Sequence, residues 1–361
     1  MSRKKQISKN KAKFYTIFSY CVVTLISACK IAYSVPQSSP YFPSLVPLSG
    51  LFGTSLLFLS LLFLFMFEEK KAFRSIVLPI IAAILSGIYF ENILDGTLVA
   101  ISFLCVGFCS YLIYSGYKNG EQKSTLCSYS SFVFTIFELL KVVILISVTA
   151  ISKNVKFTSL LFSTLEEIIN SYTGYYVALL ENATKLSPEL YTQIPSVDQS
   201  SLYSSMATVL SLIPAILYVA YFVVNFITVT IFDRMNCRYN VIKGKKFSKY
   251  DIAFTVYLFF MIFGTVYVFS MFFEYSLSPA TAGILSVVLA LLPHFVILAY
   301  RRLYAFFLKF SGKTGTVVLL FILSGTGFVF LMQLYLYILA FIGTAEYRRI
   351  RMNENKNKFI S

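Results

Sequence analysis

Nine apolar runs, most of them about 20 residues long, constrain the fold of this chain more than any other feature of its sequence. About 20 apolar residues in a helix are enough to cross the ~30 Å hydrocarbon core of a bilayer. Charged residues make up 13% of the chain, whereas a soluble domain averages about 25%. The sequence therefore predicts an all-α fold, a polytopic transmembrane helix bundle with about 8–10 spans. The runs lie at about 14–34, 45–67, 75–91, 97–116, 130–152, 206–232, 251–273, 280–300 and 315–343.

The distribution of Lys and Arg between the runs predicts the orientation of the bundle. Five alternate connecting segments together hold 21 of these residues. On the other side, the short segments 35–44, 92–96 and 274–279 hold none, and the long segment 153–205 holds three. Because cytoplasmic loops carry an excess of Lys and Arg, we expect a cytoplasmic N-terminus and a multi-pass protein of the plasma membrane. The basic segments are 1–13, 68–74, 117–124, 233–249 and 301–313.

The basic tail, residues 346–358, conflicts with a count of nine spans. Its five Lys and Arg residues would then lie outside the cell, against the charge bias. Either one run is not a full span, or the last run is broken, and eight or ten crossings would remove the conflict. Gly325 and Gly327 offer a break point in the last run, because glycine weakens a helix interior.

The chain is expected to divide into three parts. Residues 1–152 form an N-terminal group of five spans, and residues 206–361 form a C-terminal group of about four spans with the basic tail. The segment 153–205 between them is expected outside the cytoplasm, with an amphipathic helix interrupted at Gly174 and ended before Pro188. Its apolar residues recur at steps of three and four: Phe157, Leu161, Leu165, Ile168, Ile169, Tyr172, Tyr176, Leu179 and Leu180.

Glu138 and Lys141 are ionisable residues in the middle of the run 130–152. A central Lys or Asp costs about 2.5–3.5 kcal/mol on insertion, and a spacing of three places both side chains on one helix face, where they neutralise each other. That face is expected to point into the bundle. Two interpretations stay open: the pair lines a solute or proton pathway, or it is an internal ion pair that fixes helix packing.

Three further polar residues lie in apolar runs. His294, the one histidine, follows Pro293, which frees a backbone carbonyl that the imidazole could bind. Asn225 is a candidate for a hydrogen bond between helices. We count both with Glu138 and Lys141 as hypothetical substrate-binding residues. Lys30 lies near the outer end of the first run and is expected to reach the interface.

Motif searches give no sign of an enzyme. The patterns of serine hydrolases, zinc proteases and P-loop proteins are missing. The six cysteines lie in apolar runs or in the expected cytoplasmic loops, which disfavours a disulfide framework. The net charge of +15 is explained by the orientation rule and not by nucleic-acid binding. We expect no catalytic residue, no bound metal and no cofactor.

The segment LAFIGTAEYRRIR, residues 339–351, resembles the end of the YybS-like family of bacterial membrane proteins. The order of the runs is similar as well, with a span that opens at Leu212-Ile213-Pro214. Members of that family are uncharacterised, and their N-terminal spans look similar to the substrate-binding S subunits of energy-coupling-factor transporters. The resemblance implies a small-solute binding or transport-related bundle in a Gram-positive bacterium.

The leading hypothesis is an integral membrane protein that binds or moves a small solute. The second is a non-transporting scaffold or regulator that acts through basic cytoplasmic loops, above all residues 234–250. An intramembrane enzyme is the third. The lipid bilayer is the expected environment, and the candidate partners are a small-molecule solute and another membrane protein, not a nucleic acid.

Overall fold

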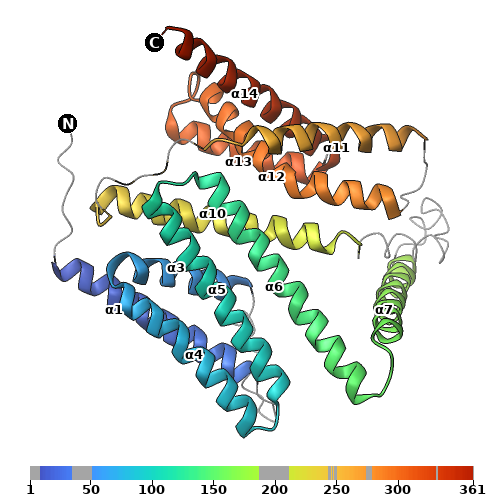
Figure 1. Cartoon of the computed structure of the whole chain (residues 1–361). Helices are drawn as coiled ribbons and strands as arrows, with labels where there is room; N and C mark the ends of the chain where they lie inside the picture. Colours follow the sequence, from blue (N-terminus) through green and yellow to red (C-terminus); the bar gives the residue numbers. More distant parts are fainter. Residues whose placement is uncertain are drawn as a thin grey trace.

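The computed structural model describes residues 9–34, 51–186, 211–242, 245, 247, 250–273, 279–330 and 332–360. These residues form helices and connecting turns without a strand, so the expected all-α fold is confirmed. Figure 1 shows how the helices pack side by side. The helices are α1 (Lys9–Ser34), α3 (Leu51–Phe67), α4 (Glu69–Tyr89), α5 (Ile93–Asn119), α6 (Lys123–Ser152), α7 (Phe157–Leu186), α10 (Ile213–Tyr239), α11 (Phe254–Phe273), α12 (Pro279–Phe307), α13 (Lys313–Phe330) and α14 (Met332–Ile360).

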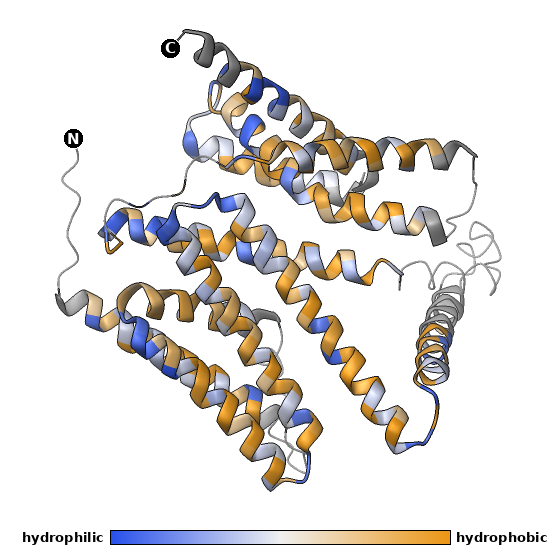
Figure 2. Ribbon diagram, in the orientation of Figure 1, coloured by the Kyte–Doolittle hydropathy of each residue, from blue (hydrophilic) through white to orange (hydrophobic). Residues whose placement is uncertain are grey.

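Six of these helices, α1, α4, α5, α6, α10 and α12, are long and apolar enough to cross a membrane. Shorter apolar stretches lie in α3, α11 and α13. The outward faces carry large apolar side chains, such as Leu85, Val142 and Phe321, and Figure 2 shows apolar residues along the helices of the bundle. A helix that is apolar on all faces is typical of a membrane-spanning segment, because its outer face contacts lipid. The fold is that of an integral, multi-pass membrane protein.

The described parts of the basic segments lie at one end of the bundle, which we call the basic end. The Lys118 ammonium at the end of α5 lies 3.4 Å from the Glu69 carboxylate at the start of α4. The Tyr15 hydroxyl in α1 lies 3.3 Å from that of Tyr239 at the end of α10. Figure 2 shows hydrophilic residues gathered on this side. The structure thus groups the segments that the charge count placed in one compartment.

The last apolar run is broken, as one of the two expected solutions required. Helix α13 ends at Phe330 and α14 begins at Met332. A Cβ atom on Gly327 would lie 2.5 Å from the Tyr335 ring, a contact that a continuous helix could not make because eight residues span about 12 Å. The chain therefore reverses between α13 and α14. The tail returns to the basic end, where Arg351 lies 3.1 Å from Asp251.

Helix α7 is the amphipathic helix expected after the fifth run. It follows α6 at the end opposite the basic end and contacts that helix (Figure 1). The expected interruption at Gly174 is wrong, because the helix continues through this residue to Leu186. One glycine costs a helix only about 0.5–1 kcal/mol, which is too little to end a helix of 30 residues. Residues 187–205 of the expected segment lie outside the described residues.

The buried apolar residues form a large N-terminal cluster and two smaller C-terminal clusters. The N-terminal cluster joins α1, α3, α4, α5 and α6 with α10, whose Phe222, Val229 and Phe232 are fully buried in it. The sequence grouped α10 with the C-terminal helices. The packing shows that this helix lies against α3, α6 and α12 and so links the two groups.

Asn236 near the end of α10 fixes the segment that follows this helix. Its buried amide nitrogen donates to the Tyr117 hydroxyl at 2.8 Å and to the Lys245 carbonyl at 2.8 Å. Its oxygen accepts from the Ile242 amide at 2.7 Å. The basic end is thus partly built by a buried polar network.

We expect Asn236→Ala to lower the free energy of unfolding by about 2–3 kcal/mol, because several buried backbone groups lose their partner. Thermal unfolding in detergent measures this loss, and hydrogen exchange at the Ile242 amide should rise. Asn119→Ala, at an exposed position in the same end, is the matched control. Unchanged exchange at Ile242 in the Asn236 variant would contradict the role of this network.

Candidate functional site

Glu138 and Lys141 form the ion pair that their spacing predicted. The Lys141 ammonium lies 2.6 Å from the Glu138 carboxylate, and the two side chains are 21% and 32% exposed respectively. The ammonium also donates to the Ser102 hydroxyl of α5 at 3.2 Å. The lysine is therefore directed at a neighbouring helix, as expected for a charged pair that faces the bundle.

Lys30 joins this pair from α1, although the sequence suggested that it reaches the interface. The side chain is buried, and its ammonium donates to the Thr54 hydroxyl of α3 at 2.8 Å. Its electrostatic environment includes both Glu138 and Lys141. The position of Lys30 inside an apolar run was the one sequence signal that this residue could be functional. The sequence does not show which residues it contacts.

Tyr221 of α10 is a further polar residue beside this ion pair. Its hydroxyl faces the Glu138 carboxylate, and its ring stacks on Phe134 with centroids 4.8 Å apart. Phe134 in turn meets Phe58 edge to face at 5.6 Å. Helices α1, α3, α5, α6 and α10 thus place six polar side chains together, flanked by aromatic rings. We call this group the polar intramembrane cluster: Lys30, Thr54, Ser102, Glu138, Lys141 and Tyr221.

The cluster has an excess of positive charge. Of its two ammonium groups, Lys141 pairs with the carboxylate of Glu138 and contacts the Ser102 hydroxyl. Lys30 donates to the neutral hydroxyl of Thr54. An ionised group inside the membrane is costly unless it is paired or wetted. Within the described part of the chain, one positive charge of the cluster thus lacks a carboxylate partner.

Asn225 lies one helical turn from Tyr221 on α10, on the same face. Its amide nitrogen donates to the Ser131 hydroxyl of α6 at 2.9 Å. The residue is fully buried, and its side-chain oxygen has no hydrogen-bond partner among the described residues. The expected hydrogen bond between helices is therefore present, and one acceptor is left over.

His294 lies apart from the cluster. Its Nε2 atom is 3.2 Å from the Ser128 hydroxyl and its Nδ1 atom is 2.7 Å from the Tyr250 hydroxyl. The buried ring also packs against Phe222 at 4.7 Å. Because Ser128 and Glu138 are ten residues apart on α6, about 15 Å separates the two places on the helix. The four residues expected to bind one solute are thus not brought to one point.

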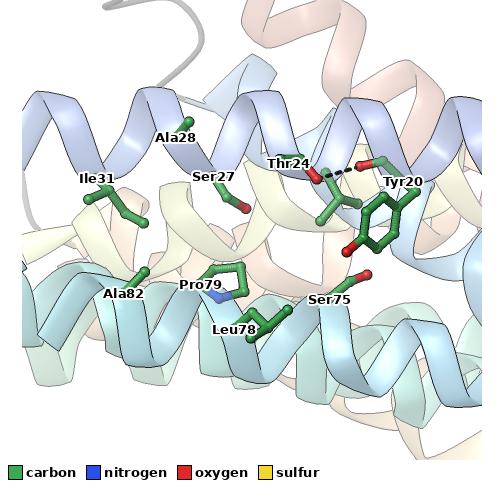
Figure 3. A pocket seen from close by; sticks show the side chains of 10 residues that line it. Tyr20, Thr24, Ser27, Ala28, Ile31, Ser75, Leu78, Pro79 and Ala82 are labelled. Carbon is green, nitrogen blue, oxygen red and sulfur yellow. Dashed lines mark hydrogen bonds between the residues drawn. The ribbon is translucent and has the colours of Figure 1, made fainter. Parts of the chain in front are cut away.

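A groove of 250 Å³ opens between α1 and α4 (Figure 3). Apolar side chains such as Leu78 and Pro79 line it, together with the hydroxyls of Ser27 and Ser75. The Ser27 hydroxyl is buried without a partner among the described residues. The groove adjoins Ile31, the neighbour of Lys30, but the Lys30 ammonium is directed to α3 instead.

Comparison of the chain with protein-family models, with curated proteins and with solved structures found no match. The fold defines the class of protein, an integral multi-pass membrane protein. Among the described residues, no group of three or more His, Cys, Asp and Glu side chains is placed to hold a metal ion.

Proposed function

We propose that the protein binds a small solute with an anionic group at the polar intramembrane cluster and moves it across the plasma membrane. The observation that carries this proposal is the ion pair of Lys141 with Glu138 together with the buried ammonium of Lys30, whose hydrogen-bond partner is the neutral Thr54 hydroxyl. A carboxylate or phosphate of the solute would match the excess positive charge. Ionisable groups in membrane helices are rare, and they mark the pathways of solutes and ions.

The proposal includes the expected kinship with the YybS-like family and with S subunits, and a cytoplasmic basic end. The two lysines are well suited to binding because each already has a neutral hydroxyl partner, Thr54 or Ser102, which orients the ammonium without neutralising it. The aromatic pair Phe134 and Tyr221 offers a surface for an apolar or planar part of the solute.

Thermal unfolding of the purified protein in detergent, with a panel of anionic, neutral and cationic solutes, tests the proposal. At a solute concentration about 100 times Kd, binding stabilises the folded state by about 2.7 kcal/mol. We expect this stabilisation from an anionic solute, its loss in Lys30→Met, and its retention in Lys71→Met. Lys71 is the matched control because it lies at the basic end and pairs with Glu68 on the surface.

The proposal is overturned if no anionic solute stabilises the protein, or if Lys30→Met and Lys71→Met respond alike. Native mass spectrometry of the purified protein provides an independent readout, since a co-purified solute should dissociate from the Lys30 variant.

A second candidate function, a scaffold or regulator, is favoured by the collection of basic segments at one end and by the network around Asn236 that holds the first part of residues 234–250. Residues 243, 244, 246, 248 and 249 of this segment lie outside the described residues. If the protein is a scaffold or regulator, the polar intramembrane cluster serves only to pack the helices, and no solute stabilises the protein. A partner protein should then dissociate when the charges of the basic end are neutralised.

A further inference from the structure

Five arginines meet where the apolar parts of α12 and α14 end. The first charged residue of α12 is Arg301 and the first of α14 is Glu346, and Arg302 lies 3.8 Å from the Glu346 carboxylate. The transition from apolar to charged residues therefore occurs at the same level in both helices, which is the level of lipid headgroups. The arginine cluster consists of Arg301, Arg302, Arg348, Arg349 and Arg351.

Two of these arginines share one buried carboxylate. Arg349 binds Glu346 with two parallel hydrogen bonds of 2.8 and 2.7 Å, and Arg302 lies 3.8 Å from the same carboxylate. The Glu346 side chain is 2% exposed, whereas Arg302 and Arg349 are 48% and 49% exposed. Glu346 thus holds both guanidinium groups from the buried side, and their exposed N–H groups are free to donate to a ligand.

The other arginines of the cluster are also held in place. Arg351 donates to the Asp251 carboxylate at 3.1 Å and to the Ile252 carbonyl at 2.9 Å. Arg348 donates to the Tyr257 hydroxyl at 2.7 Å, and Arg301 donates to the Tyr250 carbonyl at 3.3 Å. Fixed side chains lose less conformational entropy when they bind a ligand than free ones do.

The charges of the cluster are not balanced. Its two carboxylates, Glu346 and Asp251, pair with three of the five guanidinium groups, so the cluster carries three excess positive charges. The planar guanidinium fork matches the geometry of a phosphate, which binds two N–H groups at once.

The surface next to the cluster is apolar and faces outward. Ile338 and Phe341 of α14 are exposed, Phe341 to 75%, and they lie on the same helix face as Arg348 and Arg349, because residues three, four and seven positions apart in a helix line up. A basic group above an exposed apolar strip is the arrangement that a phospholipid complements with its headgroup and its acyl chain.

We propose that the arginine cluster binds the headgroup of an anionic phospholipid, with the phosphate across Arg302 and Arg349 and an acyl chain along Ile338 and Phe341. The site is separate from the polar intramembrane cluster and does not depend on the proposed solute.

The test uses the full chain in a neutral detergent, titrated with phosphatidylglycerol or phosphatidylcholine and followed by native mass spectrometry. We expect preferential binding of phosphatidylglycerol and about fivefold weaker binding in Arg302→Gln, as expected for one basic residue near a phosphate. Arg302→Gln leaves the pair of Glu346 and Arg349 in place, so the fold is preserved. Arg74→Gln removes the same charge from an exposed position of α4 and should bind like the wild type.

Equal weakening in Arg302→Gln and Arg74→Gln would overturn the proposal, because general attraction to the basic end then explains the binding. So would equal affinity of the wild type for the two lipids, or full competition by inorganic phosphate at the concentration of the lipid. The double variant Glu346→Gln/Arg349→Gln keeps the net charge but removes the fork. It should bind phosphatidylglycerol less tightly than the wild type, and unchanged binding contradicts the site.

Discussion

Replacing Glu138 with alanine is expected to lower the free energy of unfolding by about 2–4 kcal/mol, because the substitution leaves a positive charge inside the membrane without its partner. Lys141 would keep only the neutral Ser102 hydroxyl, and the charge of Lys30 would act on it without the compensating carboxylate. The side chains are a fifth to a third exposed, so the cost lies below that of a fully buried pair. Thermal unfolding and the yield of monodisperse protein in detergent measure the effect.

The double variant Glu138→Ala/Lys141→Ala is expected to be more stable than Glu138→Ala, because it removes the unpaired ammonium together with its partner. Glu166→Ala, a change of the same type at an exposed position of α7, controls for the loss of a carboxylate. Equal stability of the single and double variants would show that Lys141 gains little from Glu138. This result would also weaken the proposed solute site, which depends on the balance of charges there.

The transmembrane helices and the Glu138–Lys141 pair could be predicted from the sequence, because both depend on local patterns. Apolar length decides whether a helix can cross the bilayer, and a spacing of three decides that two side chains meet on one face. The contacts of Lys30 could not be predicted this way. Its partner Thr54 lies on another helix, and the pairing depends on how α1 packs against α3.

Tyr221 and Asn225 illustrate the same limit. Their apolar context and spacing on α10 indicated a helix, but the partners Glu138 and Ser131 are on α6, and the order of helices in the bundle decides these contacts. His294 was grouped with Glu138 and Lys141 because all three are polar residues in apolar runs. The structure shows that His294 has separate partners, Ser128 and Tyr250. Hydroxyls of serine, threonine and tyrosine give no distinct signal in an apolar run, because they also bond to their own helix backbone.

The last apolar run shows what a glycine in a membrane helix can indicate. The break expected at Gly325 and Gly327 is wrong in its position, because α13 continues past both residues to Phe330. Gly327 serves a different purpose, the close approach of the Tyr335 ring in the next helix. A glycine in a membrane helix therefore marks either a break or a contact, and the neighbouring helix decides between the two.

Gly343 is the glycine whose replacement should have the largest effect. A Cβ atom there would overlap the backbone carbonyl oxygen of Phe295 in α12. Phe295 is fully buried and stacks on Phe260 at 4.2 Å, so its backbone has no room to move away. Helices α12 and α14 can approach this closely only because Gly343 has no side chain.

We expect Gly343→Ala to destabilise the C-terminal helices by about 3 kcal/mol or more, since the added methyl group clashes with backbone and not with a side chain that can turn away. Gly264→Ala in α11 and Gly325→Ala in α13 are matched controls, because a Cβ atom at either position meets nothing within 4 Å. They should be neutral or up to about 1 kcal/mol more stable than the wild type.

Thermal unfolding in detergent compares the three variants. Phosphatidylglycerol binding reports on the arginine cluster, because the same contact between α12 and α14 brings Arg302 to Glu346. A Gly343 variant as stable as the two controls would show that α14 does not pack against α12 in this way.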